Sequence, residues 1–357
     1  MALILGIETS CDETAAAVVR DGVEVVSNVV ASQIAQHAVH GGVVPELAAR
    51  EHLKAMNPVV SSALCEANVS MCDIDAIAVT RGPGLMPALL VGLNFAKGLA
   101  AANDVPLIGV NHFLGHIYGA FLEESNEALS SVDSWPMLAL VVSGGHTSLM
   151  VINADGTAKQ VGMTIDDAAG EALDKAAKLL GLGYPGGPIM EKTARKGDDH
   201  KYKFPRPLCG ASGKPLAPEH KFNFSFSGVK TALLYHWRKL SENGNPTEQQ
   251  LYDTVASYQE AVVDVLCRKT MRAAQEFNVK TIVLCGGVAC NGVLRERLEK
   301  KCPTGVTLRL AQRKYCTDNA AMIGGVGYHS FKNGQIDTLD IDAFARLPII
   351  SQVPFTN

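Results

Sequence analysis

Two histidines, His112 and His116, lie four residues apart, a spacing that places both side chains on one face of an α-helix. Imidazoles so placed can reach a single metal ion. Asp318, which follows a predicted strand and begins a predicted helix, is the candidate third ligand. Two histidines and one carboxylate leave coordination positions open for a substrate. The alternatives are a capping role for Asp318 and two histidines with unrelated roles.

The elements that would position this pair can be read from the flanking residues. Residues 105–110 form a short apolar run bounded by Pro and Gly, which predicts a buried strand that ends just before the histidines. The pair therefore lies where a strand ends and a helix begins, the usual place for a site in an α/β protein.

Glycine-rich corners follow two other predicted strands, at residues 143–145 and 286–287, and a third glycine pair occupies residues 186–187. Backbone N–H groups that lack a neighbouring Cβ can approach phosphate oxygens closely. Neither corner fits a Walker loop or a dinucleotide fingerprint, so each alone could be an ordinary tight turn. A polar turn near the start of the chain carries Asp12 and Glu13, for which we hypothesise a role as proton acceptor; ordinary turn solvation is the alternative.

The two halves of the chain repeat one pattern of strands and turns. Residues 2–7, 15–19 and 23–26 predict three antiparallel strands, with a polar turn after the first and Asp-Gly after the second. Residues 137–142 and 149–152, with a third strand after the Asp-Gly at 155–156, repeat this order. Internal duplication explains the match better than the chance recurrence of hairpins.

Composition limits the class of protein. A length of 357 residues predicts about two domains. The net charge is −4, and the nine cysteines contain no Cys-x-x-Cys pair, which suits a reducing compartment. No apolar run approaches the length of a membrane span, and no leader pattern precedes the first strand. We expect a soluble cytoplasmic protein.

One segment departs from this acidic balance. Residues 192–239 contain eleven Lys or Arg against three Asp or Glu, a local net charge of +8, which leaves −12 on the rest of the chain. Seven aromatic residues interleave with the bases. This combination suits RNA, whereas the alternative is a solvated face with its aromatic side chains in the core.

Together these motifs closely resemble the TsaD family of tRNA N6-adenosine threonylcarbamoyltransferases, over nearly the whole chain. The resemblance rests on segments at residues 6–14 (GIETSCDET), 41–46 (GGVVPE), 81–85 (RGPGL), 112–116 (HFLGH), 142–147 (VSGGHT), 174–175 (DK), 184–187 (YPGG), 224–228 (FSFSG), 286–288 (GGV), 291 (N) and 316–319 (CTDN).

The resemblance implies the actin/Hsp70/sugar-kinase (ribonuclease H-like) fold, an α/β architecture of two duplicated lobes with mixed sheets around a central cleft. We expect an N-terminal lobe at residues 1–122, completed by the C-terminal helix at about residues 325–345. Residues 123–324 would then form a C-terminal lobe that carries the nucleotide site and the basic segment.

The activity implied by the resemblance is transfer of a threonylcarbamoyl group from threonylcarbamoyl-AMP to N6 of the adenosine 3′-adjacent to the anticodon in tRNAs that read codons beginning with A. A divalent metal would be held by His112, His116 and Asp318; iron is expected, with zinc and magnesium as alternatives. The residues expected to bind the adenylate are Val141, Val142, Ser143, Gly144, Gly145, Asp174, Gly187 and Asn291. Expected partners are tRNA and the helper proteins TsaB and TsaE, with TsaC making the adenylate, or a second copy of the chain in a mitochondrial-type homodimer; no membrane is expected.

Two positions depart from the family pattern. Asn111 stands where a further histidine is usual, and Glu191, where many relatives have Asp, could help to hold the ribose. Two other activities are alternatives. A metalloprotease would need a glutamate between the histidines, which residues 113–115 do not provide. An ATP-dependent, sugar kinase-like phosphotransferase would leave the histidine pair without a purpose.

Overall fold

The computed structural model describes residues 1–124, 129, 131–210, 217–242, 244–348 and 352–356. The described chain forms two compact units. Unit 1 contains residues 1–135, 152–158 and 311–357, and unit 2 contains residues 136–151 and 159–310. Unit 1 thus includes residues 123–135, 152–158 and 311–324, which the sequence assigned to the C-terminal lobe. None of the helices in the described ranges is long and apolar enough to cross a membrane.

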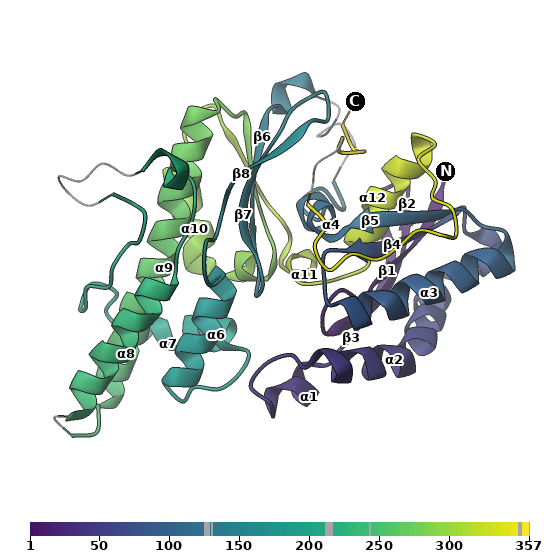
Figure 1. Cartoon of the computed structure of the whole chain (residues 1–357). Helices are drawn as coiled ribbons and strands as arrows, with labels where there is room; N and C mark the ends of the chain where they lie inside the picture. The colour runs from purple at the N-terminus through teal and green to yellow at the C-terminus, as the bar shows by residue number, and fades with distance from the viewer. Residues whose placement is uncertain (125–128, 130, 211–216, 243, 349–351, 357) are drawn as a thin grey trace. The chain divides into compact units, whose positions relative to one another are not determined.

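Unit 1 is built on a five-stranded mixed sheet with the order β3-β2-β1-β4-β5 (Figure 1). β1 pairs antiparallel with β2 and parallel with β4, as the predicted hairpin and the later strand require. Its strands are β1 (Leu3–Glu8), β2 (Glu13–Arg20), β3 (Glu24–Ser32), β4 (Ala76–Gly82) and β5 (Leu107–Asn111). Its helices are α1 (Ile34–Ala38), α2 (Pro45–Glu66), α3 (Met86–Asn103), α4 (His112–Tyr118), α11 (Arg313–Cys316) and α12 (Ala321–Lys332).

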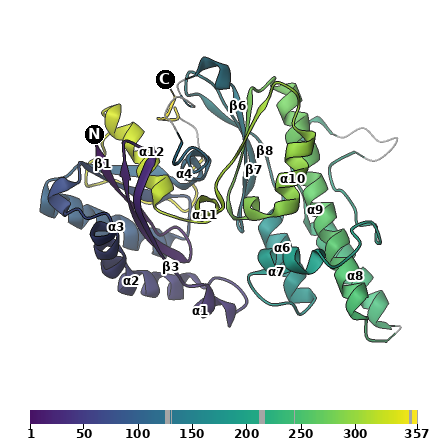
Figure 2. The ribbon, with the colours of Figure 1, turned by 180° about the vertical axis from the view of Figure 1, so that it is seen from behind.

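Unit 2 is built on a second five-stranded sheet, with the order β10-β9-β6-β7-β8. Figure 2 shows β6, β7 and β8 of this sheet beside α9 and α10. Its strands are β6 (Met137–Val142), β7 (Thr147–Ile152), β8 (Ala158–Met163), β9 (Thr281–Cys285) and β10 (Thr307–Leu310). Its helices are α6 (Ala169–Leu179), α7 (Gly186–Ala194), α8 (Ser227–Glu242), α9 (Glu248–Glu276) and α10 (Gly292–Lys301). In both sheets the first strand lies between the second and the fourth, and the fifth lies outside the fourth, as the predicted duplication requires.

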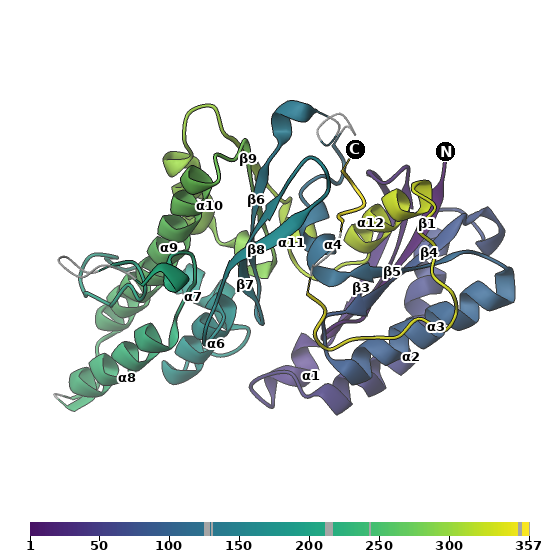
Figure 3. The same cartoon turned by 45° about the horizontal axis from the view of Figure 1, so that its top comes forward.

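Alternation along β1 divides the core of unit 1 between two layers of helices. Leu5 and Ile7 face the cluster that contains Met56 of α2 and Leu89 of α3, and all four side chains are at most 2% exposed. Gly6 points to the other face, which α12 covers (Figure 3). A Cβ on Gly6 would lie 2.2 Å from the carbonyl oxygen of Ala320, so only glycine permits this approach.

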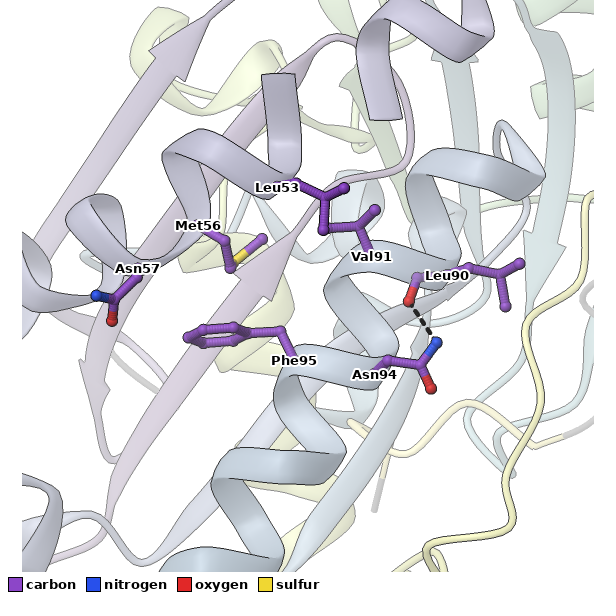
Figure 4. A pocket seen from close by; sticks show the side chains of 7 residues that line it. All are labelled: Leu53, Met56, Asn57, Leu90, Val91, Asn94 and Phe95. Carbon is purple, nitrogen blue, oxygen red and sulfur yellow. Dashed lines mark hydrogen bonds between the residues drawn. The ribbon is translucent and has the colours of Figure 1, made fainter. Parts of the chain in front are cut away.

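A shallow hollow opens between α2 and α3 on the side away from the sheet (Figure 4). It has a volume of about 380 Å³, and Leu53 and Leu90 at its edge are 69% and 43% exposed. Asn94 donates a hydrogen bond to the carbonyl oxygen of Leu90, one turn earlier on α3. The amphipathic period of both helices therefore leaves some apolar side chains on the surface of unit 1.

The segments at residues 123–133 and 208–221 are described only in part, because residues 125–128, 130 and 211–216 lie outside the described residues. All nine cysteines have free thiols. Pro58 lies inside α2, which continues past it to Glu66.

Candidate metal centre and nucleotide corner

The histidine pair lies at the junction of β5 and α4. β5 ends at Asn111 and α4 begins at His112, as the apolar run at residues 105–110 predicted. The side chain of Asn111 caps the helix, because its Oδ1 accepts a hydrogen bond from the N–H of Phe113 at 2.9 Å. Its Nδ2 donates to the carbonyl oxygen of Leu347 at 3.0 Å. Asn111 therefore stabilises the corner that presents the histidines.

The structure brings His112, His116 and Asp318 together within unit 1. The ring centroids of the histidines are 4.5 Å apart. Oδ1 of Asp318 lies 3.5 Å from Nε2 of His112 and 3.2 Å from Nε2 of His116. One donor atom from each residue lies within 4.8 Å of the others. Ligands about 2.1 Å from one metal ion lie about 3–4 Å apart, so small side-chain adjustments suffice for this cluster to hold an ion.

Asp318 is available to the cluster because its neighbour supplies the helix cap. Asp318 lies between α11 and α12, three residues before α12 begins. Oδ1 of Asn319 accepts a hydrogen bond from the N–H of Met322, and its Nδ2 donates to the carbonyl oxygen of Thr317 at 2.8 Å. The expectation that Asp318 itself begins the helix was wrong by three residues, because α12 begins at Ala321. The capping role that was the alternative for Asp318 belongs to Asn319.

Glu8, at the end of β1, orients His112 and was given no role by the sequence analysis. Its Oε2 lies 3.0 Å from Nδ1 of His112, so the imidazole carries its proton on Nδ1 and turns Nε2 toward Asp318. Its carboxylate also accepts hydrogen bonds from the N–H of Ser10 and from Oγ1 of Thr80, each at 2.5 Å. Buried carboxylates commonly hold metal-binding imidazoles in this way. Glu8 lies in the GIETSCDET segment, but only the pairing of β1 with β4 places it beside His112.

Electrostatics and unpaired atoms both favour a cation at this cluster. Burial alone would lower the pKa of His112, but the carboxylates of Glu8 and Asp318 raise it well above its usual range. Burial alone would raise the pKa of Asp318, yet the two imidazoles hold it far below its usual range. Both ring nitrogens of His116 are buried and have no hydrogen-bond partner among the described residues. Such atoms are costly to bury unless a ligand satisfies them.

Asp12 and Glu13, the hypothesised proton acceptors, also lie in unit 1. Asp12 is 7% exposed, and Oε1 of Glu13 accepts a hydrogen bond from Oγ of Ser32 at 3.3 Å. Burial, with the nearby charges of Asp318 and Asp12, raises the pKa of Glu13 to about 9. The metal-free chain therefore keeps Glu13 protonated at neutral pH, where it is a hydrogen-bond donor. The catalytic role of both acids stays a prediction.

In unit 2, the backbone of the corner after β6 has open space beside its two glycines. Val141 and Val142 are buried in the strand, and the N–H of Ser143 donates to the carbonyl oxygen of His146 at 2.8 Å. A Cβ on Gly144 or Gly145 would meet no atom within 4 Å. The glycines thus leave room for a ligand to contact the backbone.

The other residues expected to bind the adenylate are linked by hydrogen bonds within unit 2. Oδ1 of Asp174 accepts from the N–H of Gly186 at 2.7 Å, while Gly187 has open space where a Cβ would stand. Oδ1 of Asn291 caps α10 through the N–H of Leu294 at 3.0 Å. These roles position the start of α7 and the start of α10, and ligand contacts by the same residues stay a prediction.

Glu191, offered as a ribose contact, joins these two helices. Its Oε1 accepts a hydrogen bond from the N–H of Gly292 at 3.2 Å and pairs with Arg195 at 2.8 Å. Nδ2 of Asn291 donates a hydrogen bond to Oε1 of Gln259 on α9 at 3.0 Å. The polar side chains of Asn291 and Glu191 are therefore held in place by contacts within the protein, without a ligand.

Comparison with solved structures identifies the class of fold. The activator of the 2-hydroxyisocaproyl-CoA dehydratase from Clostridium difficile with bound ADPNP matches 93% of this chain and 97% of its own, with a TM-score of 0.52 and 13% identity. HypF of T. kodakarensis matches 94% of this chain and 48% of its own, with a TM-score of 0.56 and 17% identity. With its two mixed sheets of equal strand order, the chain has the actin/Hsp70/sugar-kinase fold.

Sequence comparison then places the chain within that class. The family model of TsaD, tRNA N6-adenosine threonylcarbamoyltransferase, matches residues 24–325. Proteins with that name from Syntrophotalea carbinolica and Syntrophobacter fumaroxidans are 49% and 50% identical over 97% and 96% of this chain, covering 97% and 99% of their own lengths. The chain belongs to the TsaD family.

Proposed function

We propose that this chain transfers the threonylcarbamoyl group from threonylcarbamoyl-AMP to N6 of the adenosine 3′-adjacent to the anticodon in tRNAs that read codons beginning with A. The observation that carries the proposal is near-full-length identity of 45–50% to curated relatives that bear the name of this enzyme. The fold and the arrangement of the histidine cluster agree with it. No feature of the described residues favours a protease or a sugar kinase.

The reaction that follows from these substrates is an acyl transfer. The amine N6 of adenosine attacks the carbamoyl carbon of the donor, the bond from that carbon to the phosphate oxygen breaks, and AMP leaves with the electron pair. N6 gives up one proton in the process. Because the donor is a mixed anhydride and already activated, no covalent enzyme intermediate is needed, and most of the rate gain comes from holding the weak amine in line with the carbamoyl carbon.

Residues of unit 2 would hold the donor. The backbone N–H groups of residues 143–145 can donate hydrogen bonds to donor oxygens, since the glycines leave their approach open. Asp174, Gly187 and Asn291 are proposed to border the adenylate, in agreement with the openness at Gly187 and the fixed positions of the other two.

In unit 1, His112, His116 and Asp318 would hold the divalent ion, for which two imidazoles and one carboxylate favour iron over magnesium. When bound, the ion supplies Lewis acidity toward donor oxygens. The residues of the chain position it: Glu8 fixes the orientation of His112, and His116 turns Nε2 to within 3.2 Å of Asp318.

We further propose that the chain works in the cytoplasm with the helper proteins TsaB and TsaE, or with a second copy of itself. This rests on the family and not on a partner seen in the structure. Size-exclusion chromatography of the purified chain, alone and with TsaB and TsaE from the same organism, distinguishes a homodimer from a hetero-complex.

The decisive experiment is mass spectrometry of nucleosides from an unmodified tRNA after incubation with the chain, threonylcarbamoyl-AMP and the helper proteins. We expect threonylcarbamoyladenosine to form, and to be lost after treatment with a chelator and restored by added iron. A transcript that differs only by replacement of the acceptor adenosine is the matched control. Absence of product with metal-loaded protein and all helpers present would contradict the proposed function.

A further inference from the structure

A second cavity in unit 2 is lined by positive side chains. It has a volume of about 350 Å³ and lies where α9 and α10 come together beside Cys209. Its lining residues are Cys209, Arg268, Lys269, Met271, Arg272, Gln275 and Lys301. Four of these seven are cations, and none is an acid. The walls therefore create a positive potential that would attract an anion.

The carboxylate that pairs with two of these cations, Asp264, is too heavily shared to neutralise them. Asp264 accepts from Nε of Arg268 at 2.9 Å and from Nε of Arg206 at 3.3 Å, and Nζ of Lys301 lies 3.7 Å from its other oxygen. One negative charge thus faces three positive ones. The neighbouring carboxylate of Glu260 pairs with Arg297 and Arg206, so it offers no compensation to the cavity.

Two further cations of the lining have no acid at all. Arg272 forms no hydrogen bond or ion pair with any residue in the described ranges, although its side chain is only partly exposed. Lys269 is 1% exposed, and its Nζ donates to the carbonyl oxygens of His220 and Lys221 at 2.8 and 3.1 Å. Burial lowers the pKa of Lys269 to about 8, which leaves it charged at neutral pH. An anion in the cavity would compensate both charges.

The basic segment at residues 192–239 offers less to RNA than its composition suggested. Phe204, Phe224 and Phe226 are at most 6% exposed, so they cannot stack on a base. Several of its cations are paired with acids from outside the segment: Arg195 with Glu191, Lys221 with Glu276 and Lys230 with Asp167. The lining of the cavity, by contrast, has four cations and no acid.

We propose that this cavity binds phosphate groups of the tRNA backbone. Arg268 and Arg272 lie four residues apart on α9, about 6 Å along its axis, and Lys301 approaches from α10. Arg268 and Lys301 are 54% and 44% exposed, so a polymer can reach them. Contacts to phosphates fix the position of a nucleic acid without reading its sequence. The inference rests on the proposed function, because it takes tRNA as the substrate.

The test uses full-length Arg272→Ala, Lys301→Ala and the double variant Arg272→Glu/Lys301→Glu, with Lys159→Ala, an exposed lysine of β8, as the matched control. Affinity for an unmodified tRNA is measured from 50 to 200 mM salt, together with the KM values for tRNA and for threonylcarbamoyl-AMP. We expect each alanine variant to weaken tRNA binding about 3- to 10-fold and to reduce the slope of log K against log[salt] by about 0.7–0.9. The KM for the donor and the rate at saturating tRNA should stay unchanged. The Lys159→Ala variant should have the tRNA affinity and the salt slope of the wild type.

Other results would overturn the inference. Unchanged tRNA affinity and salt slope in the charge-reversal variant would do so, and continued product formation in the same samples would leave the proposed function intact. If inorganic phosphate raises the melting temperature of the wild type but not of Arg272→Ala, while tRNA affinity is equal in both, the cavity holds a free phosphate and not RNA. Arg272→Gln, which keeps a polar side chain, controls for misfolding: it should reproduce the loss of affinity with an unchanged melting temperature.

Discussion

His116 is the residue whose surroundings most need a ligand, because its ring is buried and neither nitrogen has a hydrogen-bond partner among the described residues. We predict that His116→Ala lowers bound iron below about one tenth of the wild-type content and product formation at least about 100-fold. The melting temperature of the metal-free protein should also fall, because the variant loses a buried ring and its 3.2 Å contact with Asp318, but the protein should stay folded. Metal analysis and nucleoside mass spectrometry check both effects.

The control for this variant is His236→Ala, which removes a partly buried histidine from unit 2 and should leave the metal content at the wild-type value. Full iron content in the His116→Ala protein would contradict the assignment of His116 as a ligand.

Glu8 contacts the cluster through His112. A prediction follows that separates the effect of its negative charge from the effect of its side-chain shape. Glu8→Gln keeps the size of the side chain and can still accept a hydrogen bond from Nδ1 of His112, but removes the negative charge. We predict that metal affinity, measured by competition with a chelator, falls about 10- to 100-fold while the protein stays folded. Equal affinity in Glu8→Gln and wild type would mean that the carboxylate has no influence on the ion. Thr80→Val, which removes a partner of Glu8 and keeps its charge, should have a smaller effect.

At the scale of elements, the strands and the hairpins that join them could be predicted because hairpin turns and apolar runs are local signals. The start of α12 was misplaced because Asp318 and Asn319 are both good capping residues, and only the hydrogen bond from Met322 shows which of them caps. Glu8 was missed for a different reason: its partner His112 lies 104 positions away, and their contact depends on the order of strands in the sheet. Local pattern therefore found the ligands but not the residue that orients them.

The packing of α12 makes a prediction about pH. His329 of α12 lies with its Nε2 2.9 Å from the hydroxyl of Tyr118, and burial lowers its pKa from 6.5 to about 4. Below pH 6.5 His329 is protonated in the unfolded chain, whereas in the folded chain it becomes protonated only at about pH 4. The contribution of this histidine is therefore complete above pH 6.5 and is lost as pH falls through that window, about 2 kcal/mol by pH 5 and about 3 kcal/mol by pH 4.

Urea unfolding at pH 7.5 and pH 5 checks this effect. The stability of His329→Gln should fall less than that of the wild type between the two values, whereas His200→Gln, at an exposed histidine, should follow the wild type. An identical decrease in all three proteins would show that other groups cause the acid sensitivity.

At the scale of the whole molecule, two units with the same strand order carry different chemistry. The corner after the fifth strand of unit 1 presents the histidine pair, and the corner after the first strand of unit 2 presents open glycines. A sequence repeat predicts the shared topology, since hairpins and apolar runs recur. It does not predict which corner keeps which chemistry, because this depends on single residues such as Asn111 and Gly144.

This division of chemistry predicts that donor binding and metal binding can be separated by mutation. All three metal ligands belong to unit 1, whereas Gly144 belongs to unit 2 and has open space where a Cβ would stand. Gly144→Val should therefore fold normally and keep its iron, but its branched side chain would fill the approach to the backbone N–H groups. We expect affinity for a non-hydrolysable donor analogue, measured by calorimetry, to fall at least about 10-fold, that is about 1.4 kcal/mol.

Gly98→Val, at an equally open glycine in α3 of unit 1, should bind the analogue as the wild type does. Wild-type donor affinity in Gly144→Val would place the adenylate elsewhere, and loss of iron from the same variant would mean that the two sites are not independent.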